Sequence, residues 1–425
     1  MGKREVFILV LGAIAVGHWY AGTTHKFQLG IEVFDPALYE QLRALRLALL
    51  TNQTGIDQHG QRTVDVLRSR GCTVTYLLAP EHGLDGTGHA GSTVSDTRDA
   101  KTHIPIISLY GGGGKPFVAP HETVLATIDA FVVDLQDCGM RHYTYSSMLY
   151  KIMELAAAHD KQVVVLDRPN PLGPKTEGPI VEPSLVSFVS IAPLPLRHGL
   201  TMGELARYFN RGVLKKLARL TVIPMRGYQR KQSGTGTPGR SLCAPLSPNI
   251  KNIDSCYGYS FLCILGAIAP FFVGVTPEGS DQAFRVLALP AEYYMPEAWR
   301  AVQQVLAVHG ITSESVALRK EHTGLHVDQV AAHATHTDYV GVSLRVNYIH
   351  NLSCILVILD LLDILVPACK RQGISLTFAP IFDKLVGTQA LRAYINGTLT
   401  REEFLHKATS ESTAFREQVR DLLLY

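Results

Sequence analysis

The sequence lacks the short motifs through which several large enzyme classes bind metals or nucleotides. None of its seven cysteines belongs to a Cys-x-x-Cys pair, and His82, His89 and His103 do not have the spacing of a standard zinc site. No Gly-x-Gly-x-x-Gly follows the first expected strand, and the glycine run at 111–114 is not followed by the Lys-Ser/Thr of a P-loop. We therefore expect neither a metal nor a nucleotide cofactor.

Two further absences restrict the function. The sequence has no Gly-x-Ser-x-Gly elbow, which argues against a serine hydrolase of the α/β-hydrolase type. Only 18% of the 425 residues are charged, the net charge is +3, and basic residues do not form a stripe interleaved with aromatics. This pattern argues against a nucleic-acid partner and is compatible with a weakly charged or sugar-like ligand.

The beginning of the chain has the pattern of an export signal. Lys3 and Arg4 precede an apolar stretch at residues 6–22, the order typical of a secretory signal peptide. The stretch is close to the lower limit of about 17–25 residues for a membrane helix, so an uncleaved membrane anchor is the competing interpretation and a buried helix a third. We expect residues 1–26 to direct the chain to the periplasm or cell envelope, where they could also attach it to the membrane.

After this leader, short apolar runs alternate with helical patterns. Strands are expected at 46–51, 73–79, 104–110, 130–135 and 162–166. Helical spacing is found at 63–70, 121–128 and 146–159. The alternation indicates βαβ units and a parallel sheet. We expect an α/β protein with a Rossmann-like catalytic domain at 27–229 and a smaller C-terminal α/β domain at 230–425.

Polar residues follow four of the expected strands, where Asn52, Glu81, Asp137 and Asp167-Arg168 stand directly after apolar runs. Ligands of open α/β sheets bind beyond the carboxyl ends of the strands, so we expect these residues to share one edge and form the site. Glu81 is the first catalytic candidate, because the turn Pro80–Gly83 can hold its carboxylate rigidly for acid–base chemistry. A solvated turn glutamate is the alternative.

Two clusters add candidates for ligand binding. Asp137 is followed by Arg141 and two tyrosines, and an arginine can bind a carboxylate through two parallel hydrogen bonds. Asp167 opens a loop fixed by two prolines, although a structural pair with Arg168 or Arg141 is an equal alternative. His198 is either a general acid/base or, as we favour, a loop hydrogen bonder.

The chain resembles the NamZ-type exo-β-N-acetylmuramidases, a family once catalogued as a domain of unknown function. The segments that carry the resemblance span nearly all of the chain after the leader: LLTNQTGID (49–57), APEHGLDG (79–86), ISLYG (107–111), VDLQDCGMRHYTY (133–145), VLDRPNPLG (165–173), EGP (177–179), PLRHGLTMGELA (195–206), SPN (247–249), FDKLVGT (382–388) and FREQVRDLLLY (415–425).

This resemblance implies a Rossmann-like domain, a smaller C-terminal α/β domain and a site in the cleft between them. It implies removal of N-acetylmuramic acid from the non-reducing ends of peptidoglycan fragments, or of other amino-sugar glycans, with Glu81 as acid/base and Asp137 or Asp167 as its partner. The lactyl carboxylate of the substrate would suit Arg141 or Arg168. The expected substrate-binding residues are Asn52, His82, Arg141, Tyr143, Arg168, Asn170, His198 and Asn249.

The chain also departs from the family pattern. Residues 266–276 read GAIAPFFVGVT where family members usually carry a Glu-Gly-Thr-Asn and Gly-Arg-Gly-Thr segment, and His89 replaces an aspartate. These changes favour a second hypothesis, a weakly active or inactive muropeptide- or glycan-binding protein of the same fold. A metal-dependent hydrolase is a third hypothesis that rests only on the density of His and Asp.

Overall fold

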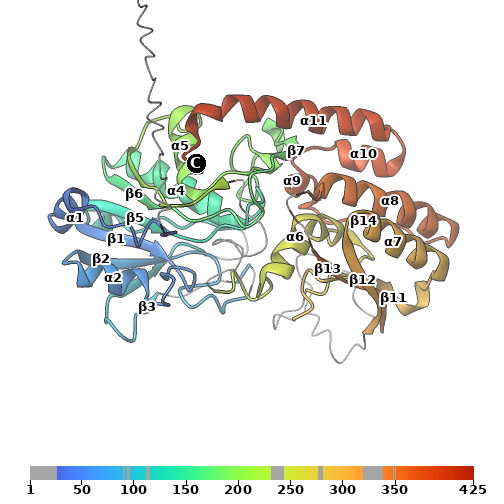
Figure 1. Cartoon of the computed structure of the whole chain (residues 1–425), viewed down its shortest axis with the longest axis horizontal. Helices are drawn as coiled ribbons and strands as arrows, with labels where there is room; N and C mark the ends of the chain where they lie inside the picture. The colour runs from blue at the N-terminus through green and yellow to red at the C-terminus, as the bar shows by residue number, and fades with distance from the viewer. Residues whose placement is uncertain are drawn as a thin grey trace, which may run out of the picture.

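A seven-stranded sheet forms the centre of the N-terminal half of the protein (Figure 1). The structure is a computed structural model that describes residues 26–425 except 90, 93–95, 112–114, 231–243, 276–280, 319–337, 348 and 350. The strands of this sheet are β1 (Arg46–Thr51), β2 (Thr73–Ala79), β3 (Thr97–Arg98), β4 (Pro105–Ser108), β5 (Ala130–Asp134), β6 (Gln162–Leu166) and β9 (Arg219–Ile223).

The strand order is β3-β4-β2-β1-β5-β6-β9, and every neighbouring pair is parallel except β3 with β4. The expected α/β architecture with a mostly parallel sheet is therefore confirmed. Because β2, β1, β5 and β6 are consecutive in the sheet and run in one direction, Glu81, Asn52, Asp137 and Asp167 follow strands that end at the same edge.

Helices cover both faces of the sheet because alternate apolar side chains of each strand point to opposite sides. Leu49 and Val132 belong to the core on one side, which also contains residues of α1 (Pro36–Arg43) and α2 (Thr63–Ser69). Val133 faces the other side. The core there contains residues of α4 (Thr144–Ala158) and α5 (Met202–Gly212), and the short helix α3 (Glu122–Leu125) contributes Leu125 to it.

The C-terminal half contains a smaller antiparallel sheet in the order β11-β13-β12. Its elements are α6 (Ile253–Leu265), β10 (Ile268–Ala269), β11 (Val286–Pro290), α7 (Pro296–Val308), β12 (Ile311–Leu318), β13 (Tyr339–Val346), α8 (Cys354–Arg371), β14 (Thr377–Phe378), α9 (Phe382–Val386), α10 (Ala390–Asn396) and α11 (Arg401–Gln418). The charge-free stretch from residue 257 is buried and broken, since α6 ends at Leu265 and β10 follows.

The two halves share one continuous apolar core, which runs from the main sheet through α4 and α5 to α6, α7 and α8. The hairpin of β7 (Glu177–Ile180) and β8 (Pro195–Arg197) packs against α11. Figure 1 shows α11, in red, lying across the top of the molecule, with the C-terminus beside α5. The chain thus returns to its N-terminal half at its end.

The expected leader and the expected polar linker cannot be compared with the structure. Residues 1–25 and most of the polar loop at 230–241 lie outside the described residues. Within the described part of the chain, no helix is long and apolar enough to cross a membrane. Six cysteines lie in the described part, and each has a free thiol: Cys72, Cys138, Cys256, Cys263, Cys354 and Cys369.

Close packing of α6 gives a first prediction. A Cβ atom added at Gly258 would lie 1.7 Å from the carbonyl oxygen of Phe284, whereas one at Gly212 would meet open space. We expect Gly258→Ala to lower the free energy of unfolding by about 1–3 kcal/mol, because the backbone must move apart. The matched change Gly212→Ala should raise it by up to about 1 kcal/mol. Urea unfolding checks both, and equal stability of the two variants would contradict this packing.

Candidate active site

A cavity of about 560 Å³ is lined by residues from both halves of the chain. The N-terminal half contributes Glu81, His82, Gly91, Tyr110, Pro116, His142, Tyr143, Thr144, Ser187, Phe188 and Val189. The C-terminal half contributes Ser247, Asn249, Ile250, Tyr259, Cys263, Val273, Val275, Phe284, Pro380, Ile381, Lys384 and Leu385. The cavity brings together four of the predicted site residues, namely Glu81, His82, Tyr143 and Asn249.

Glu81 is held firmly at the end of β2. The following residues His82 and Gly83 both have left-handed backbones, with φ of 73° and 81°, which closes a tight turn. The residue is only 8% exposed. Its Oε1 accepts a hydrogen bond from the Gly91 amide at 3.0 Å, and its Oε2 accepts one from the Thr144 hydroxyl at 2.8 Å. Burial, together with this carboxylate, raises the pKa of the neighbouring Tyr110. Glu81 is therefore oriented and not a freely solvated turn residue.

His82 and Tyr143 form part of the wall beside Glu81. The His82 Nδ1 lies 2.7 Å from the carbonyl oxygen of Gly88, which fixes the ring. The Tyr143 hydroxyl donates to the carbonyl oxygen of Leu246 at 3.0 Å. Asn52 lies behind this wall instead of lining it, because its side-chain amide donates to the Tyr145 hydroxyl at 2.6 Å.

Arg141 does not line the cavity, contrary to what its sequence position suggested. Its guanidinium is 1% exposed, and all five N–H groups are used within the protein. The acceptors, at 2.6–3.1 Å, are Ser190 Oγ and the carbonyl oxygens of Pro179, Leu194, Leu385 and Val386. Burial lowers the pKa of Arg141 to about 9, so it stays charged at neutral pH. No donor is left for a substrate carboxylate, and the residue instead joins the two halves of the chain.

The loop after β6 is likewise engaged in internal bonds. Arg168 forms a buried ion pair with Asp134, with Nη2 and Oδ2 2.8 Å apart. Asp167 is fully buried, and burial raises its pKa to about 6. Its carboxylate accepts hydrogen bonds of 2.7–2.9 Å from the amides of Arg168 and Gly203 and the hydroxyls of Thr201 and Tyr425. Both side chains hold the fold together and are absent from the cavity lining.

Asp137, His198 and Asn170 form a third buried group outside the cavity lining. The His198 Nε2 lies 3.2 Å from Asp137 Oδ2, and its Nδ1 accepts from the Leu200 amide at 3.1 Å. The Asn170 amide donates to the carbonyl oxygen of Leu200 at 2.9 Å. These bonds tie the loops after β5, β6 and β8 to one another, so in this structure the three residues support the site from behind.

His142 is a cavity residue that the sequence reasoning passed over. It is 2% exposed and packs against Tyr259 with ring centroids 4.9 Å apart. Neither ring nitrogen has a hydrogen-bond partner among the described residues. Burial and the nearby charge of Arg141 lower the pKa of His142 to about 3. The only sequence signal was its place between Arg141 and Tyr143, because the partner ring of Tyr259 is remote in the chain.

Models of two protein families match the chain in succession. "Exo-beta-N-acetylmuramidase NamZ, N-terminal" matches residues 47–254, and "Exo-beta-N-acetylmuramidase NamZ, C-terminal" matches residues 258–425. The chain belongs to the NamZ family. Peptidoglycan beta-N-acetylmuramidase NamZ of Bacillus subtilis (strain 168) is 39% identical over 236 residues, which are 55% of this chain and 55% of that protein. The alignment thus spans about half the length of that relative.

Two solved structures support the family assignment over nearly the whole chain. Both are crystal structures of DUF1343 family proteins, the former name of the NamZ family, from Bacteroides fragilis NCTC 9343. One is 28% identical with a TM-score of 0.76, and the other is 27% identical with a TM-score of 0.70. In each case the match covers 94% of this chain and 99% of the solved chain.

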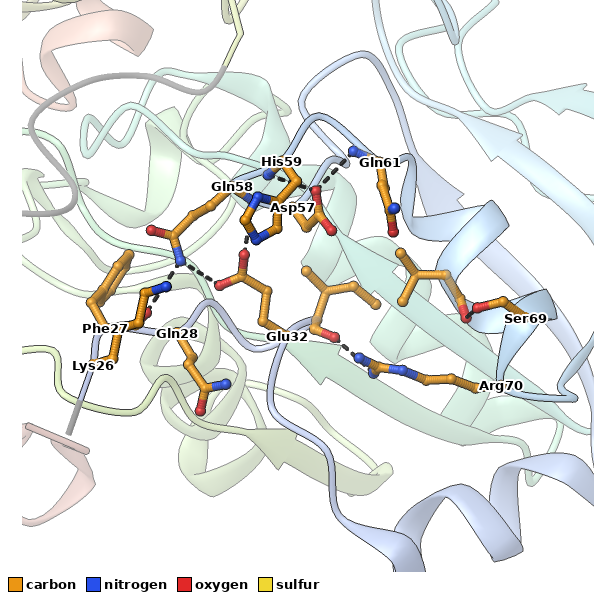
Figure 2. Close-up of a pocket in the computed structure, with 12 residues that line it drawn as sticks. Lys26, Phe27, Gln28, Glu32, Asp57, Gln58, His59, Gln61, Ser69 and Arg70 are labelled. Carbon is orange, nitrogen blue, oxygen red and sulfur yellow. Dashed lines mark hydrogen bonds between the residues drawn. The ribbon is translucent and has the colours of Figure 1, made fainter.

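A second hollow of about 300 Å³ lies away from the cavity, between the segment 26–32 and the loop 57–61 (Figure 2). The two acidic side chains that line it are hydrogen-bonded within the protein. Glu32 accepts from the backbone and side-chain amides of Gln58, and Asp57 accepts from the backbone amides of His59 and Gln61. Nowhere in the described part of the chain do three or more His, Cys, Asp or Glu side chains gather as a metal site.

The bonds of Arg141 predict a large effect on stability. In Arg141→Met the four carbonyl oxygens lose their donor while they remain buried, and we expect the free energy of unfolding to fall by at least about 3 kcal/mol. The matched change Arg300→Met, at an exposed position of α7, should alter it by less than about 0.5 kcal/mol. Chemical denaturation measures both. Similar stability of the two variants would show that the hydrogen bonds of Arg141 do not stabilise the contact between the two halves of the chain.

The lowered pKa of His142 predicts a pH effect. Below pH about 6.5 the unfolded chain protonates this imidazole and the native chain does not, so stability falls as the pH decreases towards 3. Asp167 acts in the opposite direction between pH about 4 and 6, because the native form holds the extra proton. Asp167 is present in both the wild type and His142→Phe, so its contribution cancels when the pH dependence of their free energies of unfolding is compared. From pH 7 to pH 5 the wild type should lose about 2 kcal/mol more than the variant in urea unfolding; parallel profiles would refute this.

Proposed function

We propose that the protein is an exo-acting glycosidase that removes N-acetylmuramic acid from the non-reducing ends of peptidoglycan fragments, with Glu81 as general acid/base. One observation carries the proposal: a buried carboxylate at the carboxyl end of β2, oriented by Gly91 and Thr144, lines a cavity of sugar size. Membership of the NamZ family supplies the class of substrate.

The bonding of Glu81 suits a residue that changes protonation state. The Gly91 amide can only donate, so it orients Oε1 in the carboxylate form. The Thr144 hydroxyl can donate or accept, so it can hold Oε2 both as carboxylate and as carboxylic acid. Glu81 would protonate the departing glycosidic oxygen and then take a proton from the attacking water.

Glu81 is the one carboxyl group among the described residues that line the cavity. Most glycosidases use two carboxyl groups, and substrate-assisted families are one known exception, in which an acetamido group of the sugar replaces the second. Asp137 and Asp167, the partners expected from the sequence, do not line the cavity, and Oδ2 of each is hydrogen-bonded within the protein. The aromatic rings of Tyr110 and Tyr259 supply apolar faces on which a sugar ring can stack.

The second candidate is a glycan-binding protein without catalysis. It is favoured by the apolar C-terminal side of the cavity. Val273 and Val275, which belong to the segment that departs from the family pattern, line the cavity there together with Phe284.

We also propose that the protein acts outside the cytoplasm, in the periplasm or cell envelope, on the basis of the leader pattern at residues 1–26.

The experiment that tests the proposed function is Glu81→Gln assayed on a chromogenic β-N-acetylmuramide. We expect kcat/KM to fall by about 10²–10⁴-fold, because the amide cannot exchange a proton with the glycosidic oxygen. Glu402→Gln, at an exposed position of α11, is the matched control and should retain full activity. Undiminished turnover in Glu81→Gln would remove this residue from the mechanism. Binding of muropeptides by the wild type in calorimetry, without release of product, would establish the second candidate instead.

A further inference from the structure

Three polar side chains in the wall of the cavity have buried atoms without a hydrogen-bond partner among the described residues. These atoms are both ring nitrogens of His142, Oγ of Ser187 and Oδ1 of Asn249. An unsatisfied buried polar atom costs about 1–3 kcal/mol, and native proteins contain few of them. Three such side chains border one cavity that is open to a ligand, and a ligand bound there can complete their hydrogen bonds.

The chemical state of His142 defines what it can bind. With its pKa lowered to about 3 by burial and by Arg141, the imidazole is neutral at pH 7. A neutral imidazole offers one N–H donor and one acceptor nitrogen in a single plane. Tyr259 packs on the ring and Arg141, the preceding residue, is fixed by its five hydrogen bonds. The ring is thus pre-organised for an uncharged polar group.

Asn249 also lines this cavity and belongs to a tight turn. The Leu246 amide donates to the carbonyl oxygen of Ile250 at 2.8 Å, and the Ile250 amide donates to that of Ser247 at 3.1 Å. The hydroxyls of Tyr143 and Tyr145 donate to the carbonyl oxygen of Leu246, which ties this turn to the segment that carries His142. The free Oδ1 of Asn249 needs an N–H or O–H donor from a ligand.

We propose that His142 and Asn249 bind the 2-acetamido group of an amino sugar and so position its anomeric carbon at Glu81. The acetamido group carries one acceptor, its carbonyl oxygen, and one donor, its N–H, on opposite edges. The imidazole N–H binds the carbonyl oxygen, and Asn249 Oδ1 accepts the N–H. The methyl group then lies against apolar side chains such as Val273 and Phe284.

This arrangement agrees with the covalent structure of the substrate. The acetamido group is on C2 of the sugar, next to the anomeric carbon whose bond is cleaved. His142 is two residues from Thr144, which orients Glu81, and all three residues line the same cavity. The inference rests on the proposed function only for the role of Glu81; the recognition of an acetamido sugar stands on the cavity itself.

Titration calorimetry tests the inference with two ligands. The first is N-acetylmuramic acid, and the second is the same 3-O-lactyl sugar with a hydroxyl in place of the acetamido group. We expect the wild type to bind the first at least about 10-fold more tightly, the equivalent of one or two hydrogen bonds. This comparison requires no variant. A wild type that binds neither ligand, or both equally, would overturn the inference.

Two variants locate the effect. His142→Phe keeps a ring against Tyr259 but removes both nitrogens, and we expect it to weaken binding of the acetamido sugar about 10-fold and leave the hydroxyl analogue unchanged. His142→Asn restores a donor and an acceptor and should recover part of the preference. His406→Phe, exposed on α11, is the matched control. Equal weakening of both ligands in His142→Phe would indicate a structural role and contradict the assignment.

The outcome is separable from that of the proposed function. Acetamido-selective binding without turnover would disprove the hydrolase and leave this inference intact. Turnover of the chromogenic glycoside with no preference for the acetamido group would disprove this inference and leave the hydrolase intact.

Discussion

The guanidinium of Arg141 is the interaction on which the site depends most. A buried positive charge is costly unless polar groups surround it, and here four carbonyl oxygens and one hydroxyl do so from every side. Two of the carbonyls belong to Leu385 and Val386, more than 240 residues further along the chain. Gly387 must be a glycine for this contact, since a Cβ there would lie 2.3 Å from Arg141 Nη2. One side chain thereby sets the position of both cavity walls.

The polar residues along the sheet edge divide into two groups by their hydrogen bonds. Asp167 and Oδ2 of Asp137 accept hydrogen bonds from within the protein, and these bonds hold the loops in place; Oδ1 of Asp137 has no partner among the described residues. Glu81 has donors too, but they leave its carboxyl group facing the cavity. His142 and Asn249 have partners for part of their surface only. Among the residues that line the cavity, the atoms that the protein leaves unsatisfied mark the groups available to a ligand.

Much of the fold follows from local sequence. A run such as Ala130–Asp134 is buried on both faces of a parallel sheet, and its β-branched and aromatic composition predicts a strand without knowledge of its neighbours. Glu81 could be singled out because its turn and its strand are consecutive in the chain. The sheet edge on which it lies follows from the same alternation of strands and helices.

The roles of Arg141, Arg168 and His142 could not be predicted in this way. Whether an arginine binds substrate or carbonyl oxygens depends on residues that the fold brings near, such as Asp134 for Arg168. Family resemblance does not separate the two roles, because the segment 133–145 contains both Arg141, which bonds within the protein, and the cavity-lining residues His142 and Tyr143. The structure gives no support to the substrate-binding role expected for Arg141: its sequence neighbours are polar, but its spatial neighbours are backbone carbonyls.

The free cysteines can serve as probes of local unfolding at different places in the molecule. Only a thiolate reacts with alkylating reagents, and burial raises the pKa of Cys72, of Cys263 to about 12 and of Cys369 to about 11. These thiols are protonated in the native state, and those of Cys72 and Cys369 are buried as well, whereas Cys263 is partly exposed. Cys72 lies in the N-terminal core, Cys263 in the cavity wall and Cys369 on α8. The alkylation rates of Cys72 and Cys369 therefore report local opening of the first and the second half, and the rate of Cys263 reports access to the cavity, all in one sample.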